Sequence, residues 1–221
     1  MDITSELTTR YVGALADLGL RTAVISPGSR STPLSLAFAL EPRIELHVLH
    51  DERSAAFFAL GAAKALGSPT AVVATSGTAA AHYHPAVSEA SHARVPLLVH
   101  TADRPPELRG SGAPQTVDQI KLFGDTVKLF HDVGVPDAPT AAAAPSLALR
   151  AWSAALDAPP GPVHLNFPFR EPLATPLAPA SPDPALRHDA RALLDVAPQT
   201  LRAALRVLEL HDEGNHLIPL T

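Results

Sequence analysis

The chain has 221 residues, with 17 Lys and Arg against 22 Asp and Glu, so its formal net charge is −5. A mildly acidic chain lacks the basic face that sequence-independent nucleic-acid binding needs, and the absence of cysteine excludes disulfides, thiolate metal sites and a cysteine nucleophile. No apolar run reaches the ~20 residues of a membrane span, and the N-terminus does not resemble a secretory signal. We therefore expect a cytoplasmic protein that binds neither nucleic acid nor membranes.

The first predicted element is a helix followed by a buried strand. Apolar residues recur at helical spacing at Leu7, Tyr11, Leu15 and Leu18. Gly19 stands where such a helix would end, and a short apolar run at 22–26 predicts the strand. The turn after this strand opens a second helix, in which Thr32 suits the N-cap and Pro33 the first helical position.

Strands and helices continue to alternate along the chain. Further strands are expected at 44–50, 71–75, 96–101, 127–130 and 162–167. Helices are expected at 52–66, in an Ala-rich segment after Thr78, and at 145–157. Nearly continuous apolar strands separated by helices favour parallel strands that are covered on both faces. The pattern therefore predicts an α/β fold, an open, doubly wound parallel sheet with helices on both faces.

Prolines indicate where this domain ends. Five of the 23 prolines fall within 172–186, which is typical of a linker. We expect a first domain over 1–173, a Pro-rich linker over 174–190, and the start of a truncated further domain over 191–221. That last segment contains one amphipathic helical pattern, at 198–210.

Four polar clusters follow predicted strands, at the sheet edge where open parallel sheets bind ligands. They lie at 27–31, 50–53, 75–78 and 101–106. The first and third are strand-to-helix turns of small residues, whose backbone N–H groups can bind an anion. Ordinary helix caps and turns have the same composition, so both interpretations stay open. Neither turn has the lysine of a Walker loop.

Two charged residues in these clusters allow a functional and a purely structural interpretation. Glu52 begins an otherwise very apolar helix. It is either an acid favoured by the helix dipole or a partly buried carboxyl that shares a proton with a ligand. Arg104 follows Asp103 and either pairs with it locally or clamps a substrate carboxylate.

The 11 histidines do not have the spacing of a metal site. His82 and His84 are two residues apart on an expected helix and do not share a face. His47 and His50 are three apart on an expected strand and point to opposite faces. We predict no metal ligand in this chain.

Five motifs, taken together and in this order, resemble the MenD family, the 2-succinyl-5-enolpyruvyl-6-hydroxy-3-cyclohexene-1-carboxylate (SEPHCHC) synthases. They occupy 26–34, 51–57, 75–79, 101–108 and 112–115. The resemblance covers residues 1 to about 173 and implies the pyrimidine-binding (PYR) domain of a thiamine-diphosphate-dependent transferase of menaquinone biosynthesis. Its substrates would be 2-oxoglutarate, which loses CO₂, and isochorismate, which receives the succinyl unit.

The resemblance also implies roles for individual residues. Glu52 would be catalytic, because its carboxyl would share a proton with N1′ of the cofactor's aminopyrimidine ring. Cofactor-binding residues would be Pro27, Gly28, Glu52, Thr75, Gly77 and Thr78. Residues that bind isochorismate would be Ser29, Arg30, Arg104 and Gln115. One position departs from the family pattern: His82 stands where an Asn is usual.

The family's second α/β domain carries a Gly-Asp-Gly motif that binds Mg²⁺ and the diphosphate, and this sequence contains no such motif. The resemblance therefore implies an N-terminal portion of the enzyme, inactive alone, whose thiamine diphosphate and Mg²⁺ sites are completed in a homodimer or higher assembly. Two alternatives stay open. In the first, the chain would be a non-catalytic PYR-like domain that dimerises or regulates. In the second, it would be the PYR domain of another acetolactate-synthase-like enzyme.

Overall fold

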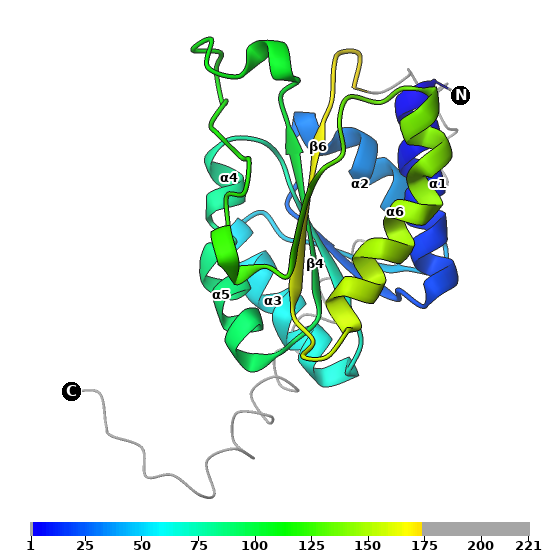
Figure 1. The fold of residues 1–221 in the computed structure, drawn as a ribbon, viewed down its shortest axis with the longest axis vertical. Coiled ribbons are helices and arrows are strands. Elements are labelled where there is room, and N and C mark those ends of the chain that lie inside the picture. Colours follow the sequence, from blue (N-terminus) through cyan, green and yellow to red (C-terminus); the bar gives the residue numbers. More distant parts are fainter. Residues whose placement is uncertain (1, 174–221) are drawn as a thin grey trace, which may run out of the picture. The chain divides into compact units, whose positions relative to one another are not determined.

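The computed structural model describes residues 2–173, which form a six-stranded sheet between two layers of helices (Figure 1). The strands are β1 (Thr22–Ile25), β2 (Glu45–Val48), β3 (Thr70–Ala74), β4 (Leu97–Asp103), β5 (Leu129–Asp132) and β6 (Pro162–Pro168). The helices are α1 (Ile3–Leu18), α2 (Thr32–Ala39), α3 (Glu52–Leu66), α4 (Thr78–Ala81), α5 (His84–Ala93) and α6 (Ala138–Leu156). The predicted linker and the predicted helix at 198–210 lie outside the described residues.

The strand order is β2-β1-β3-β4-β6-β5, and all five neighbouring pairs are parallel. The predicted open parallel α/β sheet is therefore confirmed. Strand β2 lies next to β1 toward one edge of the sheet, whereas β4 lies next to β3 toward the opposite edge. The order thus reverses between β1 and β3. In open α/β sheets the crevice beyond this reversal is the usual place for a ligand.

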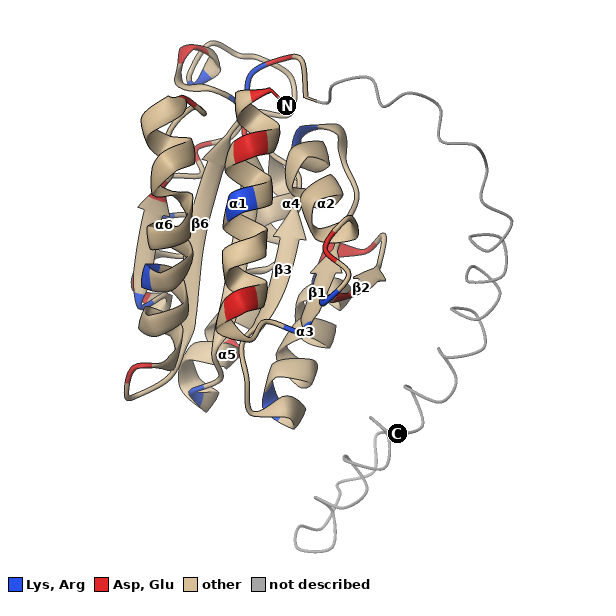
Figure 2. Cartoon of the chain, turned by 90° about the vertical axis from the view of Figure 1, so that its right-hand side faces the viewer, with Lys and Arg blue, Asp and Glu red and all other residues tan. Residues whose placement is uncertain are grey.

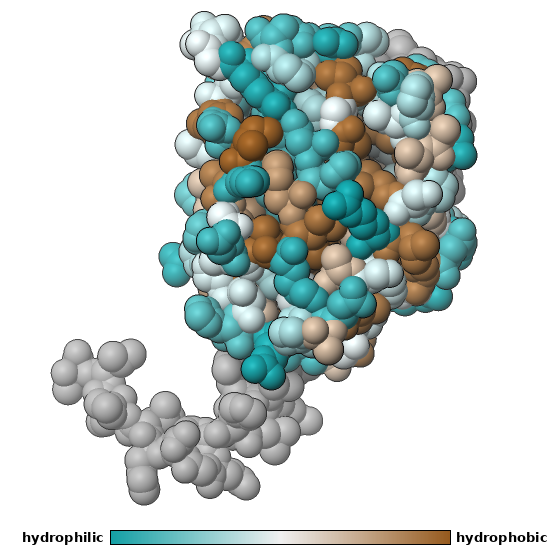
Figure 3. Space-filling view, viewed as in Figure 1, coloured by the Kyte–Doolittle hydropathy of each residue, from teal (hydrophilic) through white to brown (hydrophobic). Residues whose placement is uncertain are grey.

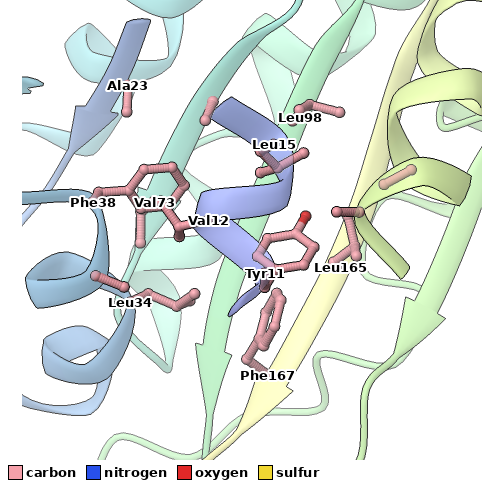
Figure 4. Close-up of a cluster of buried hydrophobic side chains, with 14 of the residues drawn as sticks. Tyr11, Val12, Leu15, Ala23, Leu34, Phe38, Val73, Leu98, Leu165 and Phe167 are labelled. Atoms are coloured by element: carbon pink, nitrogen blue, oxygen red, sulfur yellow. The ribbon is translucent and has the colours of Figure 1, made fainter. Parts of the chain in front are cut away.

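Alternating side chains along each strand supply two separate hydrophobic cores. Ala23 and Ile25 of β1 belong to the core under α1, α2 and α6, and Val24 between them belongs to the core under α3 and α5. In the first core, Tyr11 and Leu15 of α1 lie against the sheet (Figure 4). Helices α1 and α6 pack side by side on this face (Figure 2). Both faces are thus covered, as the predicted double winding requires.

Three predicted elements differ from the observed ones. The helix expected at 145–157 begins earlier, at Ala138, and contains Pro145 in its interior. The Ala-rich segment forms two helices, because α4 ends at Ala81 and α5 begins at His84. The strand expected at 127–130 lies at Leu129–Asp132.

On the face of the described residues drawn in Figure 3, patches of hydrophobic residues are separated by hydrophilic ones. Within residues 2–173, no helix combines the length and the apolar character needed to cross a membrane.

Candidate active site

The turns that follow β1 and β3 touch each other at the point where the strand order reverses. The Ser26 N–H donates to the carbonyl of Val73 at 2.9 Å. A Cβ built on Gly28 would lie 2.4 Å from the Cβ of Thr75, closer than real Cβ atoms come. The backbone of Gly28 therefore lies directly against the Thr75 side chain, an approach that only glycine allows. Two of the four polar clusters predicted at this edge are brought together here.

Two arginines add positive charge beside this contact. Arg30 is only 8% exposed, and its Nη1 donates to the carbonyl of Phe169 at 2.9 Å. Its Nε is buried without a hydrogen-bond partner in the described part of the chain. Arg104 donates from Nη1 to Ser76 Oγ, in the turn after β3. Burial lowers the pKa of Arg104, and the neighbouring charge of Arg30 lowers it further. Two guanidiniums thus lie close enough to repel each other, and the Glu171 carboxylate, 3.1 Å from Arg30 Nη2, offsets part of this repulsion and raises the pKa of Arg104.

Of the two interpretations of Arg104, the local ion pair with Asp103 is not formed within residues 2–173. The fully buried Asp103 carboxylate instead pairs with Arg109, whose Nη2 lies 2.9 Å from its Oδ2. Arg109 also pairs with Asp132 at 3.1 Å, and Asn166 Nδ2 donates to both of these carboxylates. Asp103 accepts from the backbone N–H of Arg104 at 2.7 Å. The Arg104 guanidinium therefore forms no ion pair with this carboxylate among the described residues, and it donates to Ser76 Oγ.

Glu52 is the first residue of α3, and it is half-buried. Asp51 caps the helix, accepting from the Ser54 N–H at 2.7 Å. The Glu52 carboxyl is therefore not used by the cap, and no described residue donates a hydrogen bond to it. It forms no ion pair with Arg30 or Arg104 within residues 2–173, so it is not joined directly to the arginines.

Two buried hydroxyls lie between Glu52 and the turn after β1. Tyr83 is fully buried, and burial raises its pKa well above the usual range; the charge of Glu52 raises this pKa further, whereas nearby Ser26 lowers it. The two hydroxyls interact with each other, and neither has a further hydrogen-bond partner of regular geometry among the described residues. Sequence reasoning missed both, since each looks like an ordinary core or turn residue. Buried, unpaired hydroxyls are uncommon and indicate a place that a polar ligand or water completes.

The long connection between β4 and β5, the green loop at the upper left of Figure 1, supplies two glutamines to the turn after β3. Gln115 Nε2 donates to the carbonyl of Ser76 at 2.9 Å. Gln119 is fully buried, and its Oε1 accepts from the Gly77 N–H at 2.9 Å. This N–H is therefore occupied within the chain and is not free to bind an anion, as one interpretation of the turn expected. No motif or spacing in the sequence distinguishes Gln119.

The remaining predicted residues surround these contacts. Pro27, Ser29 and Thr78 are exposed in the turns after β1 and β3. His82 is exposed at the end of α4, and its charge helps to lower the pKa of Asp51, next to Glu52. In the described part of the chain, no group of three or more His, Asp or Glu side chains could hold a metal ion. The predicted roles of all these residues, and the cytoplasmic location, stay predictions.

Comparison with known proteins agrees with this arrangement. Residues 6–122 match the family described as thiamine pyrophosphate enzyme, N-terminal TPP binding domain. The chain is 62% identical over 177 residues to the SEPHCHC synthase of Haloquadratum walsbyi, which is 78% of this chain and 28% of that protein. It is 57% identical over 175 residues to the SEPHCHC synthase of Thermobifida fusca, 78% of this chain and 32% of that protein.

A third relative extends the match further along the chain. The SEPHCHC synthase of Lysinibacillus sphaericus is 50% identical over 207 residues, 93% of this chain and 36% of that protein. The resemblance inferred from the five motifs is confirmed by these identities. The chain spans about a third of the length of the curated relatives it matches.

Proposed function

The chain belongs to the family of thiamine pyrophosphate enzymes, matching their N-terminal TPP binding domain, and from that premise we propose that it forms the PYR part of a SEPHCHC synthase. The observation that carries the proposal is the meeting of the turns after β1 and β3, with Gly28 against Thr75 and two arginines beside them. The relatives' names support the same reaction. Fold alone would not, since one fold serves many functions.

The residues around this contact fit the aminopyrimidine end of thiamine diphosphate (thiamine pyrophosphate). The wall against the ring is proposed to consist of Pro27, Gly28, Thr75, Gly77 and Thr78, with the Gly28 backbone packed directly on the Thr75 side chain. The Glu52 carboxyl accepts no hydrogen bond from the described chain, and near it the buried Tyr83 hydroxyl interacts with Ser26 and has no partner of regular geometry among the described residues. When bound, thiamine diphosphate supplies the nucleophilic carbon on which a 2-oxo acid can lose CO₂.

Glu52 has the task of holding a proton at N1′ of the ring. A carboxylate at a helix N-terminus, with its cap supplied by Asp51, is held in place without being neutralised by a partner. Sharing a proton with a ring nitrogen then changes which tautomer the ring adopts. The protein contributes this control and the orientation of the ring, and the cofactor contributes the difficult bond chemistry.

Arg30 and Arg104 have the task of binding carboxylates of isochorismate, together with Ser29 and Gln115. Isochorismate carries two carboxylates, and guanidinium forks match carboxylates with paired hydrogen bonds. The lowered pKa of Arg104 indicates a partly desolvated cation beside another cation, which an anionic substrate stabilises. 2-Oxoglutarate is the proposed second substrate, on the strength of the relatives' name.

The remaining parts of the site are proposed to lie outside residues 2–173. The described residues contain no cluster that fits Mg²⁺, and no step is assigned to the metal here. We propose that Mg²⁺ and the diphosphate are held by a further domain, and that a second subunit of the same protein completes the site. Menaquinone biosynthesis is the pathway in which the proposed reaction would act.

A chimera tests the proposal. Residues 1–173 of this chain replace the matching segment of the Thermobifida fusca relative, and SEPHCHC formation from 2-oxoglutarate and isochorismate is measured with thiamine diphosphate and Mg²⁺. We expect an active enzyme. Glu52→Gln should lower kcat by roughly 10² or more, the scale of proton-transfer catalysis, whereas the free energy of unfolding should fall by only about 0.3–1 kcal/mol, the contribution of a charge at a helix N-terminus.

The matched control is Glu89→Gln, an exposed carboxyl on α5 away from both turns, which should leave kcat unchanged. A folded chimera without activity would favour the non-catalytic PYR-like domain. A folded chimera that is inactive with isochorismate but decarboxylates another 2-oxo acid would favour an acetolactate-synthase-like enzyme, and an active chimera whose KM for isochorismate is unaffected by Arg104→Lys would rule out the role given to Arg104. Full activity of the Glu52→Gln chimera would rule out the role given to that residue.

A further inference from the structure

Three side chains from the connection between β4 and β5 hold the turn at Ser76 and Gly77. Arg104 donates to Ser76 Oγ, Gln115 donates to the Ser76 carbonyl, and Gln119 accepts from the Gly77 N–H. Arg104 and Gln115 are partly or fully exposed, so both can also reach a ligand. Gln119 has no exposed surface at all. Its effect on any ligand must therefore pass through the turn.

Every polar atom of the Gln119 amide is used. Its Nε2 donates to the carbonyl of Ala102 at 3.0 Å and to Asn166 Oδ1 at 3.0 Å. A backbone carbonyl can only accept, so the amino group must lie on that side and Oε1 must lie toward Gly77. Asn166 is itself held by Asp103, and its Oδ1 also accepts from Thr101 at 2.8 Å. The acceptor offered to Gly77 is thus fixed by a network anchored in β4 and β6.

The turn that receives this hydrogen bond needs external support. Gly77 has φ 83° and ψ −148°, a region that residues with side chains rarely adopt. A Cβ there would lie 2.8 Å from Gln115 Cγ, so the turn and the connection are in close contact. Without the Gln119 oxygen, the buried Gly77 N–H would lose its partner, and an unsatisfied buried N–H favours rearrangement of the backbone that carries it.

We propose that Gln119 is a positioning residue that fixes the conformation of the turn at 75–78 and thereby the cofactor-binding surface formed by Thr75, Gly77 and Thr78. The inference rests on the proposed function only for the identity of the cofactor. Gln119 itself touches no ligand. It transmits the rigidity of the buried Asp103–Asn166 network to the turn.

The first experiment measures hydrogen exchange at the Gly77 amide by NMR in the 221-residue chain. Gln119→Met keeps an unbranched side chain of similar length but removes the acceptor and both donors. We expect Gly77 to exchange at least ~10-fold faster, beyond any change in global stability. The matched control is Thr116→Val, which removes a hydrogen bond to the Pro114 carbonyl in the same connection without touching Gly77 or the buried network, and should change this exchange less than twofold.

Gln119→Glu is a second variant, needed in case Gln119→Met fails to fold. It keeps the size and an acceptor for Gly77 but cannot donate to both Ala102 and Asn166. Exchange at Gly77 should be intermediate between the wild type and Gln119→Met. Unchanged exchange at Gly77 in both variants overturns the proposal.

The second experiment uses the active chimera and measures the thiamine diphosphate concentration that gives half-maximal activity. Gln119→Met should raise this concentration at least ~10-fold while kcat at saturating cofactor falls less, whereas Thr116→Val should shift neither. Faster Gly77 exchange with an unchanged cofactor requirement means that Gln119 only stabilises the fold, and the proposal is wrong. If the parent chimera is inactive, the proposed function fails, while exchange at Gly77 still decides whether Gln119 sets the turn.

Discussion

Gly77 is restricted twice, by its own backbone and by its neighbour. Its φ of 83° is costly for any residue with a Cβ. A Cβ would also lie 2.8 Å from Gln115 Cγ and 3.1 Å from the Gln115 carbonyl oxygen. The side-chain atom could move, but the backbone oxygen belongs to a residue that is itself at φ 56°. The two restrictions act together, so the site turn and the β4–β5 connection depend on each other.

Gly77→Ala should therefore lower the free energy of unfolding by roughly 1–3 kcal/mol, the range for a residue forced into a sparsely populated backbone region. The control is Gly61→Ala, inside α3, where nothing lies within 4 Å of the added Cβ. That change should raise stability by about 0.5–1 kcal/mol, because alanine favours a helix interior over glycine. Urea denaturation followed by circular dichroism measures both. Equal stability of the two variants would contradict the argument.

At this scale the sequence identifies residues whose motif is local and misses those whose partner is distant. Arg30 and Arg104 stand in recognisable motifs after β1 and β4. Gln119 is separated by 42 residues from the Gly77 N–H that it accepts from. Asp103 pairs with Arg109, six residues further along, across the turn at η2 (Pro106–Leu108), and not with its neighbour Arg104. Such pairings follow from the tertiary fold, which local patterns do not encode.

Helix α6 shows how a strong local signal can be read in the wrong place. The apolar residues Leu147, Leu149, Trp152 and Leu156 predict a helix over 145–157, whereas α6 begins seven residues earlier, at Ala138, and contains Pro145. The true start has a complete capping box, in which Asp137 accepts from the Thr140 N–H at 2.8 Å and Thr140 Oγ1 accepts from the Asp137 N–H at 2.8 Å. The apolar face from Ala141 onward packs on α1 and carries the helix through the proline. Tertiary burial overrides the local preference.

Helices α4 and α5 show the converse. The alanines after Thr78 favour one continuous helix, but His82 and Tyr83 separate two. Pro85 cannot donate a hydrogen bond to the preceding turn, and it suits the first turn of a new helix. The break sets Tyr83 into the core beneath α3. The sequence therefore predicts the order and type of the elements well, and their boundaries less well.

Pro145→Ala should raise the free energy of unfolding by roughly 2–2.6 kcal/mol. Pro145 is exposed in the interior of α6, where proline is unfavourable by ~3 kcal/mol, and part of that gain is offset by ~0.4–1 kcal/mol from a more flexible unfolded chain. The control is Pro139→Ala in the first turn of the same helix, where proline is well tolerated. It should give no gain. Denaturation midpoints compare the two, and a gain from the control alone would sink the explanation.

At the scale of the whole molecule, two imidazoles are buried within the sheet layer. His100 of β4 is fully buried among Tyr11, Phe38 and Phe167, with its Nε2 2.8 Å from the Tyr11 hydroxyl. His164 of β6 is also fully buried, and its Nε2 lies 2.7 Å from Thr101 Oγ1. Burial lowers the pKa of His100 to about 4. Burial, and then the charge of His100, lower the pKa of His164 to about 3.

These two groups make the folded chain sensitive to mild acid. An unfolded histidine takes up a proton near pH 6.5, whereas the folded ones resist it until the pH is far lower. Between about pH 6.5 and 4 the unfolded state holds more protons, so stability falls as the pH falls, by up to ~1.4 kcal/mol per pH unit for each histidine. Above that window the contribution is fully present and constant.

The measurement is the free energy of unfolding in urea at several pH values between 6.5 and 5, a window above most carboxylate titrations. His164→Gln keeps a polar group beside Thr101 and removes one titrating site. The slope of its free energy of unfolding against pH should therefore be shallower than that of the parent, by up to ~1.4 kcal/mol per pH unit. His92→Gln, at an exposed position on α5, should leave the slope as it is. Because slopes are compared, a uniform loss of stability in either variant does not affect the conclusion. Parallel slopes for the parent and His164→Gln would mean that this imidazole does not stay neutral in the folded chain.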